Sequence, residues 1–121
     1  MREEFQWAVG LFEGEGSVSV KDSKRRKWRY KYALLSLVST DKDVLRKFFR
    51  IVSVGSFNGG RKGYNQKSRG KRKPYWSWSV RGKAAEILCK KFLPYLGQRR
   101  KQRAKHVLKE VKQWQITHLL N

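Results

Sequence analysis

The sequence predicts a single domain, residues 1–121, of the α+β class, with the element order α-β-β-α-β-β-α and a four-stranded antiparallel sheet. Its length suits one modest hydrophobic core. Apolar residues recur with a helical period in some segments and at alternate positions in others. Because the order helix-strand-strand occurs twice, we expect helices on one face of the sheet and a polar, basic opposite face.

The first helix is expected before a glycine-rich stretch. Phe5, Val9 and Phe12 fall at i, i+4 and i+7, and the glycines that follow should end the helix. Glu15 should then lie just past the helix C-terminus, where free carbonyl groups carry partial negative charge. A carboxylate is unfavourable there unless a cation is present, and a divalent metal is the simplest such cation.

Two glycines of this helix suggest a contact between two copies of the chain. Gly10 and Gly14 are four residues apart and share a helix face, which would let a second helix approach closely. A two-fold axis between two copies would place two Glu15 side chains side by side. This arrangement suits metal-assisted phosphodiester cleavage on two strands.

The first strand pair is expected at 17–21 and 28–39. Val18 and Val20 alternate with Ser17, Ser19 and Lys21, which predicts a strand with one buried and one polar face. In the second strand, Arg29 and Lys31 are predicted to face away from Trp28, Tyr30 and Tyr32, and the register of the apolar end, 34–38, stays open. Thr40 or Asp41 can cap the next helix, residues 42–52.

The second repeat follows the same plan. Val54 and Phe57 should begin the third strand, with a turn or bulge at 58–60. The fourth strand is expected at 75–80, with Trp76, Trp78 and Val80 buried. The third helix should bury Ala84, Ile87, Leu88 and Phe92, and Pro94 should end or kink it. A final helix is expected at 98–120, with the apolar set Ala104, Val107, Leu108, Val111, Trp114 and Ile116.

The charge of the chain points to a polyanionic partner. Thirty Lys and Arg residues against nine Asp and Glu residues give a formal net charge of +21, which indicates nucleic acid. Ribosomal or chromatin-type proteins share this balance but do not need an acidic, glycine-rich stretch. The single cysteine excludes an internal disulfide and a cysteine-based zinc site. No apolar run approaches the length of a membrane span, so we expect no membrane partner.

The stretch from Trp7 to Gly16 resembles the signature of the LAGLIDADG homing endonucleases. Gly10-Leu11-Phe12 matches the Gly-Leu-Ile part, and Glu13-Gly14-Glu15-Gly16 matches Asp-Ala-Asp-Gly with Glu at both acidic positions. Ala8-Val9 stands where the family has Leu-Ala. The resemblance extends to the element order of nearly the whole chain.

The resemblance implies a saddle-shaped sheet that binds double-stranded DNA, and one signature copy in a chain of this length matches the homodimeric branch. It implies a site-specific hydrolase of intron-homing type that makes a double-strand break in a long, near-palindromic site and leaves short 3′ overhangs. The cofactor would be Mg²⁺, two or three ions per dimer site, with Mn²⁺ as a substitute, and no small-molecule substrate is expected. The location would be intracellular, in a bacterial or phage-host cytoplasm or an organelle.

The alternative within the family is an RNA maturase or another non-cleaving DNA- or RNA-binding protein. In such proteins the nuclease site decays. The retention of Glu15 between two glycines argues against this alternative.

The resemblance also implies roles for individual residues. Glu15 would be catalytic and bind the metal, together with the Gly14 carbonyl group, while Glu13 would have a supporting role. The water-positioning residue would fall on Thr40, or on Asp41 if the register shifts by one. The basic residue before the last helix would be Arg99, with Lys101 as the chemical alternative; it would stabilise negative charge on the scissile phosphate. The predicted dimer interface consists of Trp7, Gly10, Leu11 and Gly14.

The DNA-binding residues are predicted in the two basic hairpins and on the polar face of the sheet. Lys and Arg side chains there can contact phosphates or guanine edges. The predicted set is Ser19, Lys21, Lys24, Arg25, Arg26, Lys27, Arg29, Lys31, Arg61, Lys62, Lys67, Arg69, Lys71, Arg72, Lys73, Ser77, Ser79 and Arg81.

Overall fold

The computed structural model describes residues 2–25, 28–62 and 74–119, and the side chains at 2, 25, 28, 29, 60–62 and 119 lie outside this description. The elements are α1 (Arg2–Glu15), β1 (Ser17–Arg25), β2 (Trp28–Ser39), α2 (Lys42–Val52), β3 (Ser56–Lys62), β4 (Pro74–Arg81), α3 (Lys83–Phe92), the 3-10 helix η2 (Leu93–Tyr95) and α4 (Gln98–Leu119). The predicted element order is confirmed. The last helical part is divided at η2, where Pro94 ends α3, as expected.

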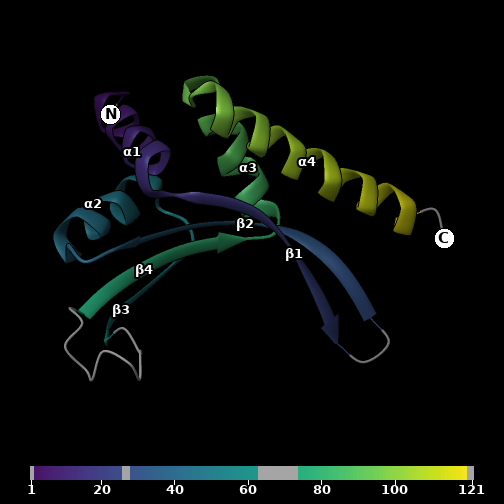
Figure 1. Ribbon diagram of the computed structural model, residues 1–121, viewed down its shortest axis with the longest axis horizontal. Helices are drawn as coiled ribbons and strands as arrows, with labels where there is room; N and C mark the ends of the chain where they lie inside the picture. The colour runs from purple at the N-terminus through teal and green to yellow at the C-terminus, as the bar shows by residue number, and fades with distance from the viewer. Residues whose placement is uncertain (1, 26–27, 63–73, 120–121) are drawn as a thin grey trace.

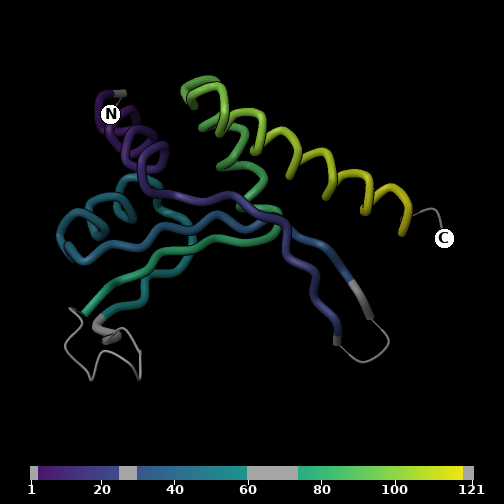
Figure 2. Tube along the Cα trace, viewed as in Figure 1, coloured from purple at the N-terminus to yellow at the C-terminus, as the bar shows by residue number. Residues whose placement is uncertain are grey.

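The four strands form one antiparallel sheet in the order β1-β2-β4-β3. The helices lie on one side of this sheet, and the ends of the strand pairs curve away from them (Figure 1). Helix α4 runs from beside α1 toward the β1–β2 hairpin, so it covers the part of the sheet that α1, α2 and α3 leave open (Figure 2). The predicted α+β class and the single helix-covered face are confirmed.

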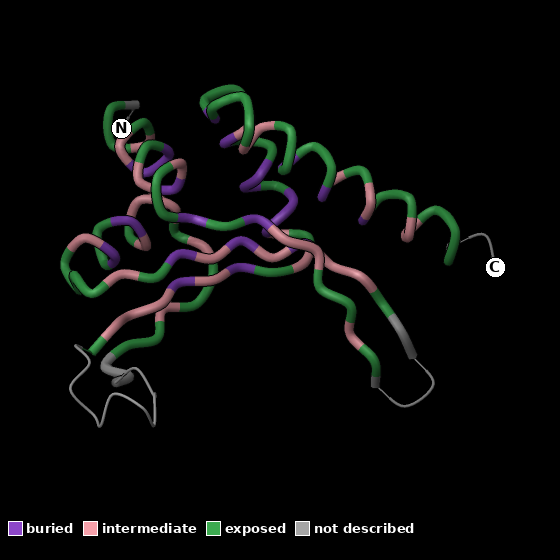
Figure 3. The backbone as a smooth tube through the Cα atoms, in the orientation of Figure 1, coloured by how far each residue is buried: buried purple, intermediate pink, exposed green. Residues whose placement is uncertain are grey.

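The core lies between the helices and the covered face of the sheet, as the buried segments show (Figure 3). Trp78 of β4 is its centre, because the ring is fully buried against Phe12 of α1 and Phe48 of α2. Its Nε1–H donates a hydrogen bond of 2.8 Å to the Val54 carbonyl group, so the indole buries no unsatisfied donor. Phe92 of α3 packs on the same phenyl rings.

The pairing of the central strands settles the register of β2. Ala33, Leu35 and Leu37 are buried under the helices, whereas Val38 is half exposed on the other face. Lys31 shares the face of Ala33, so it faces away from Tyr30 and Tyr32 as predicted, but its predicted place on the DNA-binding face is wrong. Tyr30 and Tyr32 lie on the open face instead, because a strand alternates with a period of two.

The helix faces were predicted less accurately than the strands. In α3 the chain buries Ala85 and Cys89 with Leu88 and Phe92, while Ile87 is 49% exposed. In α4, Ala104, Val107 and Val111 are buried as expected, but Ile116 lies on the surface. The third strand begins at Ser56, two residues after Val54, and the predicted bulge is present between Asn58 and Arg61.

The end of the first helix differs from the prediction, and the open choice of cap for α2 is settled. Glu15 is the last residue of α1, not the first beyond it, and Gly10 and Gly14 lie within the helix. The chain leaves the helix at Gly16, whose N–H donates to the Phe12 carbonyl group at 2.8 Å, and a Cβ there would collide with the Phe12 ring. Asp41, and not Thr40, caps α2 by accepting from the N–H groups of the first turn.

In the described parts of the chain, no helix is both long enough and apolar enough to cross a membrane.

Candidate functional site

The two carboxylates at the end of α1 lie in different surroundings. Residues two apart on a helix point to nearly opposite sides. Glu13 turns toward α4, where its Oε2 accepts a hydrogen bond of 3.1 Å from the Gly97 N–H. Glu15 is exposed and forms no ion pair with any residue that the structure describes. One carboxylate is therefore held by the fold, and the other is open to a ligand.

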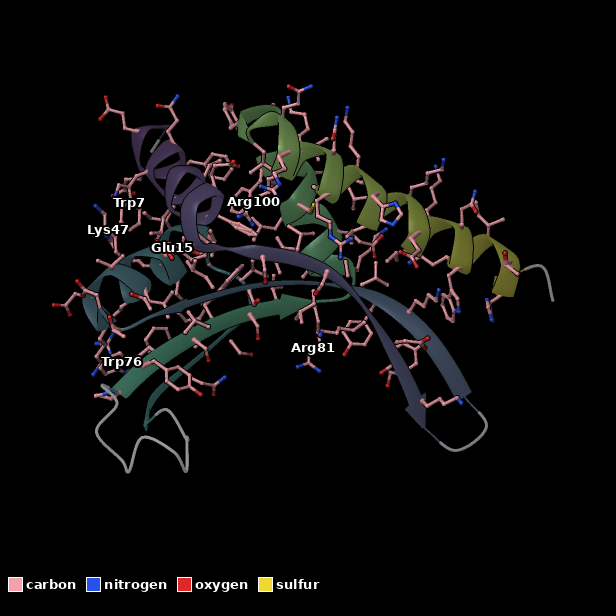
Figure 4. All side chains as sticks on the ribbon, in the orientation of Figure 1. Trp7, Glu15, Lys47, Trp76, Arg81 and Arg100 are labelled. Carbon is pink, nitrogen blue, oxygen red and sulfur yellow. The ribbon has the colours of Figure 1, made fainter. Side chains whose placement is uncertain are left out.

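Arg100 connects the end of α1 to the start of α4 (Figure 4). Its guanidinium donates a hydrogen bond to the Gly16 carbonyl group, lies 3.9 Å from Glu13 Oε2 and sits 6.0 Å from the centre of the Phe12 ring. The side chain thus holds the residue that follows Glu15. The prediction placed a basic residue within the run 99–101 and favoured Arg99 or Lys101 over Arg100. The signal for Arg100 is its spacing of four and seven residues from Ala104 and Val107, which places it on the inner face of α4.

A basic hollow of about 340 Å³ lies beside the held carboxylate. It is lined by Glu13, Arg99, Arg100 and Arg103. Arg103 is fixed at its edge by a hydrogen bond of 3.3 Å from Nε to the Val18 carbonyl group. Arg99 thus lines this hollow and Lys101 does not, while the catalytic role of either residue stays a prediction.

A second hollow, of about 390 Å³, lies beside the open carboxylate. Its lining consists of Leu11, Glu15, Leu37, Val38, Ser39 and Thr40. The predicted water-positioning residue Thr40 and the predicted metal ligand Glu15 are therefore brought together. The alternative, Asp41, is committed to its cap, and Ser39 Oγ accepts from the Asp41 N–H at 2.9 Å. The two hollows have no lining residue in common, so Arg99 does not share the hollow of Glu15.

The residues at the end of α1 fit a hard divalent cation. The Glu15 carboxylate and the Gly14 carbonyl group supply oxygen donors, and Mg²⁺ is usually bound by one or two carboxylates with waters and substrate phosphates completing its shell. Within the described residues, no group of three His, Cys, Asp or Glu side chains could hold a metal ion alone. A cation here would need further ligands from water, from a phosphate or from a second copy of the chain.

The predicted dimer surface is open along α1. A Cβ at Gly10 or Gly14 would meet nothing within 4 Å, and both residues are exposed. Trp7, on the same helix, is half buried beneath the Lys47 ammonium group of α2, which lies 4.2 Å above the ring centre. The face has room for the close approach of a second helix.

The open face of the sheet carries a polar band formed by side chains of β1 and β4, the two strands beside β2. Ser19 and Lys21 of β1 and Ser77, Ser79 and Arg81 of β4 lie on it, as predicted. Lys31 does not, because it lies on the helix-covered face and its Nζ is 3.3 Å from Glu110 Oε1 of α4. Lys24 has the parity of the covered face and is exposed near the end of β1.

For the remaining predicted DNA-binding residues, the structure describes no side-chain position. Arg25, Arg29, Arg61 and Lys62 belong to strands, but their side chains lie outside the description. Arg26, Lys27, Lys67, Arg69, Lys71, Arg72 and Lys73 lie outside the described residues.

No protein-family model matches the sequence, and no curated protein matches it either. Solved structures do match. The homing endonuclease I-CvuI in complex with its target has a TM-score of 0.71 at 20% identity, covering 97% of this chain and 71% of that chain. For the LAGLIDADG homing endonuclease I-GzeII in complex with a DNA target, the TM-score is 0.70 at 19% identity, over 96% of this chain but 38% of that one.

The homing endonuclease I-TnaI matches with a TM-score of 0.69 at 16% identity, over 95% of this chain and 76% of that one. These likenesses cover the sheet and helices together, not one motif. The predicted resemblance is confirmed at the level of structure: the chain has the fold of the LAGLIDADG homing endonucleases.

Proposed function

We propose that the chain is a site-specific DNA endonuclease that acts as a homodimer and cuts both strands of a long, near-palindromic duplex site. The observation that carries the proposal is the position of Glu15. It is an exposed carboxylate at the negative end of α1, it lacks a cationic partner among the described residues, and it lies next to the open glycine face.

Duplex DNA is the partner that the charge and the open face favour. A formal net charge of +21 supplies the phosphate attraction, and the polar band on the sheet supplies hydrogen-bonding groups. I-CvuI and I-GzeII, which share the fold, are described in complex with DNA targets. A symmetric dimer would present the same band twice, which is why the site should be nearly palindromic.

The dimer would form along α1. Gly10 and Gly14 allow close approach of the partner helix, with Trp7 and Leu11 beside them. The two Glu15 side chains would then face the two scissile strands.

The chemistry proposed at this site depends on a divalent cation, Mg²⁺ or in its place Mn²⁺, bound by Glu15 and the Gly14 carbonyl group. When bound, such a cation activates water and stabilises the leaving oxygen. I-CvuI complexes are described in the presence of Ca and of Mg. The number of ions per dimer site, two or three, remains a prediction.

The other residues would orient the reacting groups. The Thr40 hydroxyl group, in the hollow of Glu15, would hold the attacking water. Arg99 would oppose negative charge on the phosphate, with Lys101 as the alternative. Arg100 is a positioning residue, because it binds the Gly16 carbonyl group and so fixes the backbone after Glu15.

The test is incubation of the protein with a randomised duplex library in Mg²⁺ and, separately, in Ca²⁺, followed by sequencing of cut ends. We expect discrete Mg²⁺-dependent double-strand cuts that are lost in Glu15→Gln. Glu4→Gln is the matched control, because it removes the same charge from an exposed position at the other end of α1. Tight binding without cutting under any metal would overturn the nuclease and favour the non-cleaving alternative.

The number of protein copies in the complex with DNA, measured by analytical ultracentrifugation, tests the dimer separately. Two copies per target duplex are expected. A single copy bound stably to a full-length site would contradict the two-fold arrangement even if cutting occurred.

A further inference from the structure

Three side chains form a continuous cluster on the open face where β4 ends. Tyr30 and Tyr32 of β2 lie with their ring centres 5.6 Å apart. The Arg81 guanidinium carbon lies 5.9 Å from the centre of the Tyr32 ring. Tyr30 is 43% exposed, so a large aromatic side chain lies on the surface at this position. In the side-chain view, Arg81 projects from the sheet on the side away from the helices (Figure 4).

The backbone of Arg81 is held on both sides. Val80, before it, is buried in the core. Gly82, after it, donates a hydrogen bond of 3.0 Å to the Ala33 carbonyl group and has a φ of +73°, which favours glycine. Arg81 pairs with Leu34, so Tyr32 is its diagonal neighbour on the same face. The Arg81 side chain therefore extends from a backbone held in place and lies over the ring of Tyr32.

Stacking leaves the hydrogen-bonding edge of a guanidinium free. A planar Arg side chain can lie over an aromatic ring through its face while its N–H groups remain available at the edge. Within the part of the chain that the structure describes, Arg81 forms no ion pair that would occupy this edge. An oriented, unoccupied guanidinium edge matches the O6 and N7 acceptors of guanine in the major groove.

We propose that Arg81, oriented by Tyr32, recognises one guanine in each half of the target site. Tyr32 is a positioning residue that limits the directions in which the guanidinium can point, and Tyr30 packs beside its ring. This inference rests on the proposed function in one respect, that the open face binds duplex DNA. Beyond that function, it names the base that is recognised, guanine, the residue that contacts it, Arg81, and the residue that orients the contact, Tyr32.

The neighbouring Lys21 provides a contrast on the same face. Lys21 pairs with Tyr32 across β1 and β2 and is exposed. An ammonium group on a flexible stem is suited to contact a phosphate without selecting a base. Arg81 and Lys21 should therefore respond differently to substitution, although both are cations beside the same ring.

The experiment is selection of bound duplexes from a randomised library in Ca²⁺, with sequencing and with affinity measured for each single-base change. Binding is read without cleavage, so a chain that does not cut DNA still tests the inference. For the wild type we expect one position per half-site at which guanine is preferred by about 10- to 100-fold. Arg81→Gln should move the preference at that position to adenine, because Gln pairs with adenine N6 and N7.

Tyr32 variants test the positioning role. Tyr32→Phe should keep the guanine preference, because the ring remains, whereas Tyr32→Leu should reduce it about 2- to 5-fold at that position alone. Lys21→Gln should weaken binding to all sequences about equally and lower the magnitude of the salt slope by about 1.8, because the dimer loses two phosphate contacts at about 0.9 each. Circular dichroism should show the same fold for all four variants.

Three results would overturn the proposal. If Arg81→Gln weakens every sequence equally, Arg81 contacts a phosphate. If the wild type selects no guanine position, or Tyr32→Leu alters positions that Arg81→Gln does not, the assigned pair is wrong. If the wild-type protein shows the guanine preference but does not cut DNA in Mg²⁺, the proposed nuclease activity is refuted and this inference stands.

Discussion

Removing the charge from Glu13 and from Glu15 should change stability in opposite directions. The two substitutions, Glu13→Gln and Glu15→Gln, remove the same charge from the same helix two residues apart. Their difference depends only on surroundings, because Glu13 faces α4 and Glu15 faces a hollow open to solvent.

Glu15 adds negative charge at the negative end of the α1 dipole. This placement costs about 0.3–1 kcal/mol at an exposed helix end. It has no ion pair among the described residues to offset the cost. Glu15→Gln should therefore raise the unfolding free energy by about 0.5 kcal/mol in the absence of metal and DNA.

Glu13 receives compensation at the same helix end. Its Oε2 accepts from the Gly97 N–H at 3.1 Å and lies 3.9 Å from Arg100 Nε, in surroundings where the Glu13 side chain is 38% exposed. A charge-assisted bond is worth about 1.5–3 kcal/mol when buried, and partial exposure reduces this to about 1 kcal/mol. Glu13→Gln should lower the unfolding free energy by about this amount.

The assay is urea unfolding in EDTA at low salt, with thermal unfolding as a second measure. About 4 °C per kcal/mol is expected for a domain of this size. Glu13→Gln should therefore melt about 4 °C below the wild type, and Glu15→Gln about 2 °C above it. If both substitutions destabilise the protein equally, then Glu15 has a structural partner and the reasoning that assigns it to a metal is refuted.

Three further predictions concern the helix face, the core and the thiol. Gly10→Leu should raise the unfolding free energy of the monomer by about 0.5–1 kcal/mol, because the position is open and leucine favours helix, yet abolish dimerisation in sedimentation. Gly10→Ala should stabilise the monomer at least as much but weaken dimerisation less, and a Gly10→Leu variant that still dimerises would contradict the proposed dimer interface along α1. Trp78→Phe should cost about 2–4 kcal/mol in urea unfolding, through lost volume and the unmade bond to Val54; a loss under 1 kcal/mol would show that the core repacks. Burial raises the pKa of the Cys89 thiol to about 11, against an opposing effect of Lys90, so the proton stays on the folded thiol through pH 9 and any stability from its burial is lost as pH rises from about 9 to 11. A thiol reagent at pH 8 should react only on unfolding; rapid labelling of the native protein would contradict this.

Strand alternation predicted most of the sheet because one face is buried along most of each strand. Val18, Trp78 and Val80 carry the alternation, and all three are buried. The same rule failed at the start of β2. There the covering element is α4, and its Glu110 lies 3.3 Å from the Lys31 ammonium group, so the covered face takes Lys31 while Tyr30 and Tyr32 occupy the open face. The identity of this ion-pair partner on a distant helix could not be inferred from the alternation within β2.

Helix faces were harder to predict, because small residues can lie on the buried face beside large ones and an apolar side chain can remain on the surface. In α3 the sheet side takes Ala85 and Cys89, while the larger Ile87 lies at the surface. The choice of basic residue at the site was also difficult to predict. The run of three cations at the start of α4 gave no reason from charge to choose among them, and only the spacing to Ala104 and Val107 separates Arg100 from its neighbours.

The geometry at the end of α1 separates a fixed backbone from a free side chain. Arg100 binds the Gly16 carbonyl group, Phe12 accepts from the Gly16 N–H, and Glu13 holds the Gly97 N–H, so the chain on either side of Glu15 is tied to α4 or to the helix. A ligand group works best when its support is rigid and its donor atoms are unoccupied. The fold provides rigidity through Glu13 and leaves the Glu15 carboxylate exposed at an energetic cost. A structural role for Glu15 would not require that cost, whereas binding a cation would recover it.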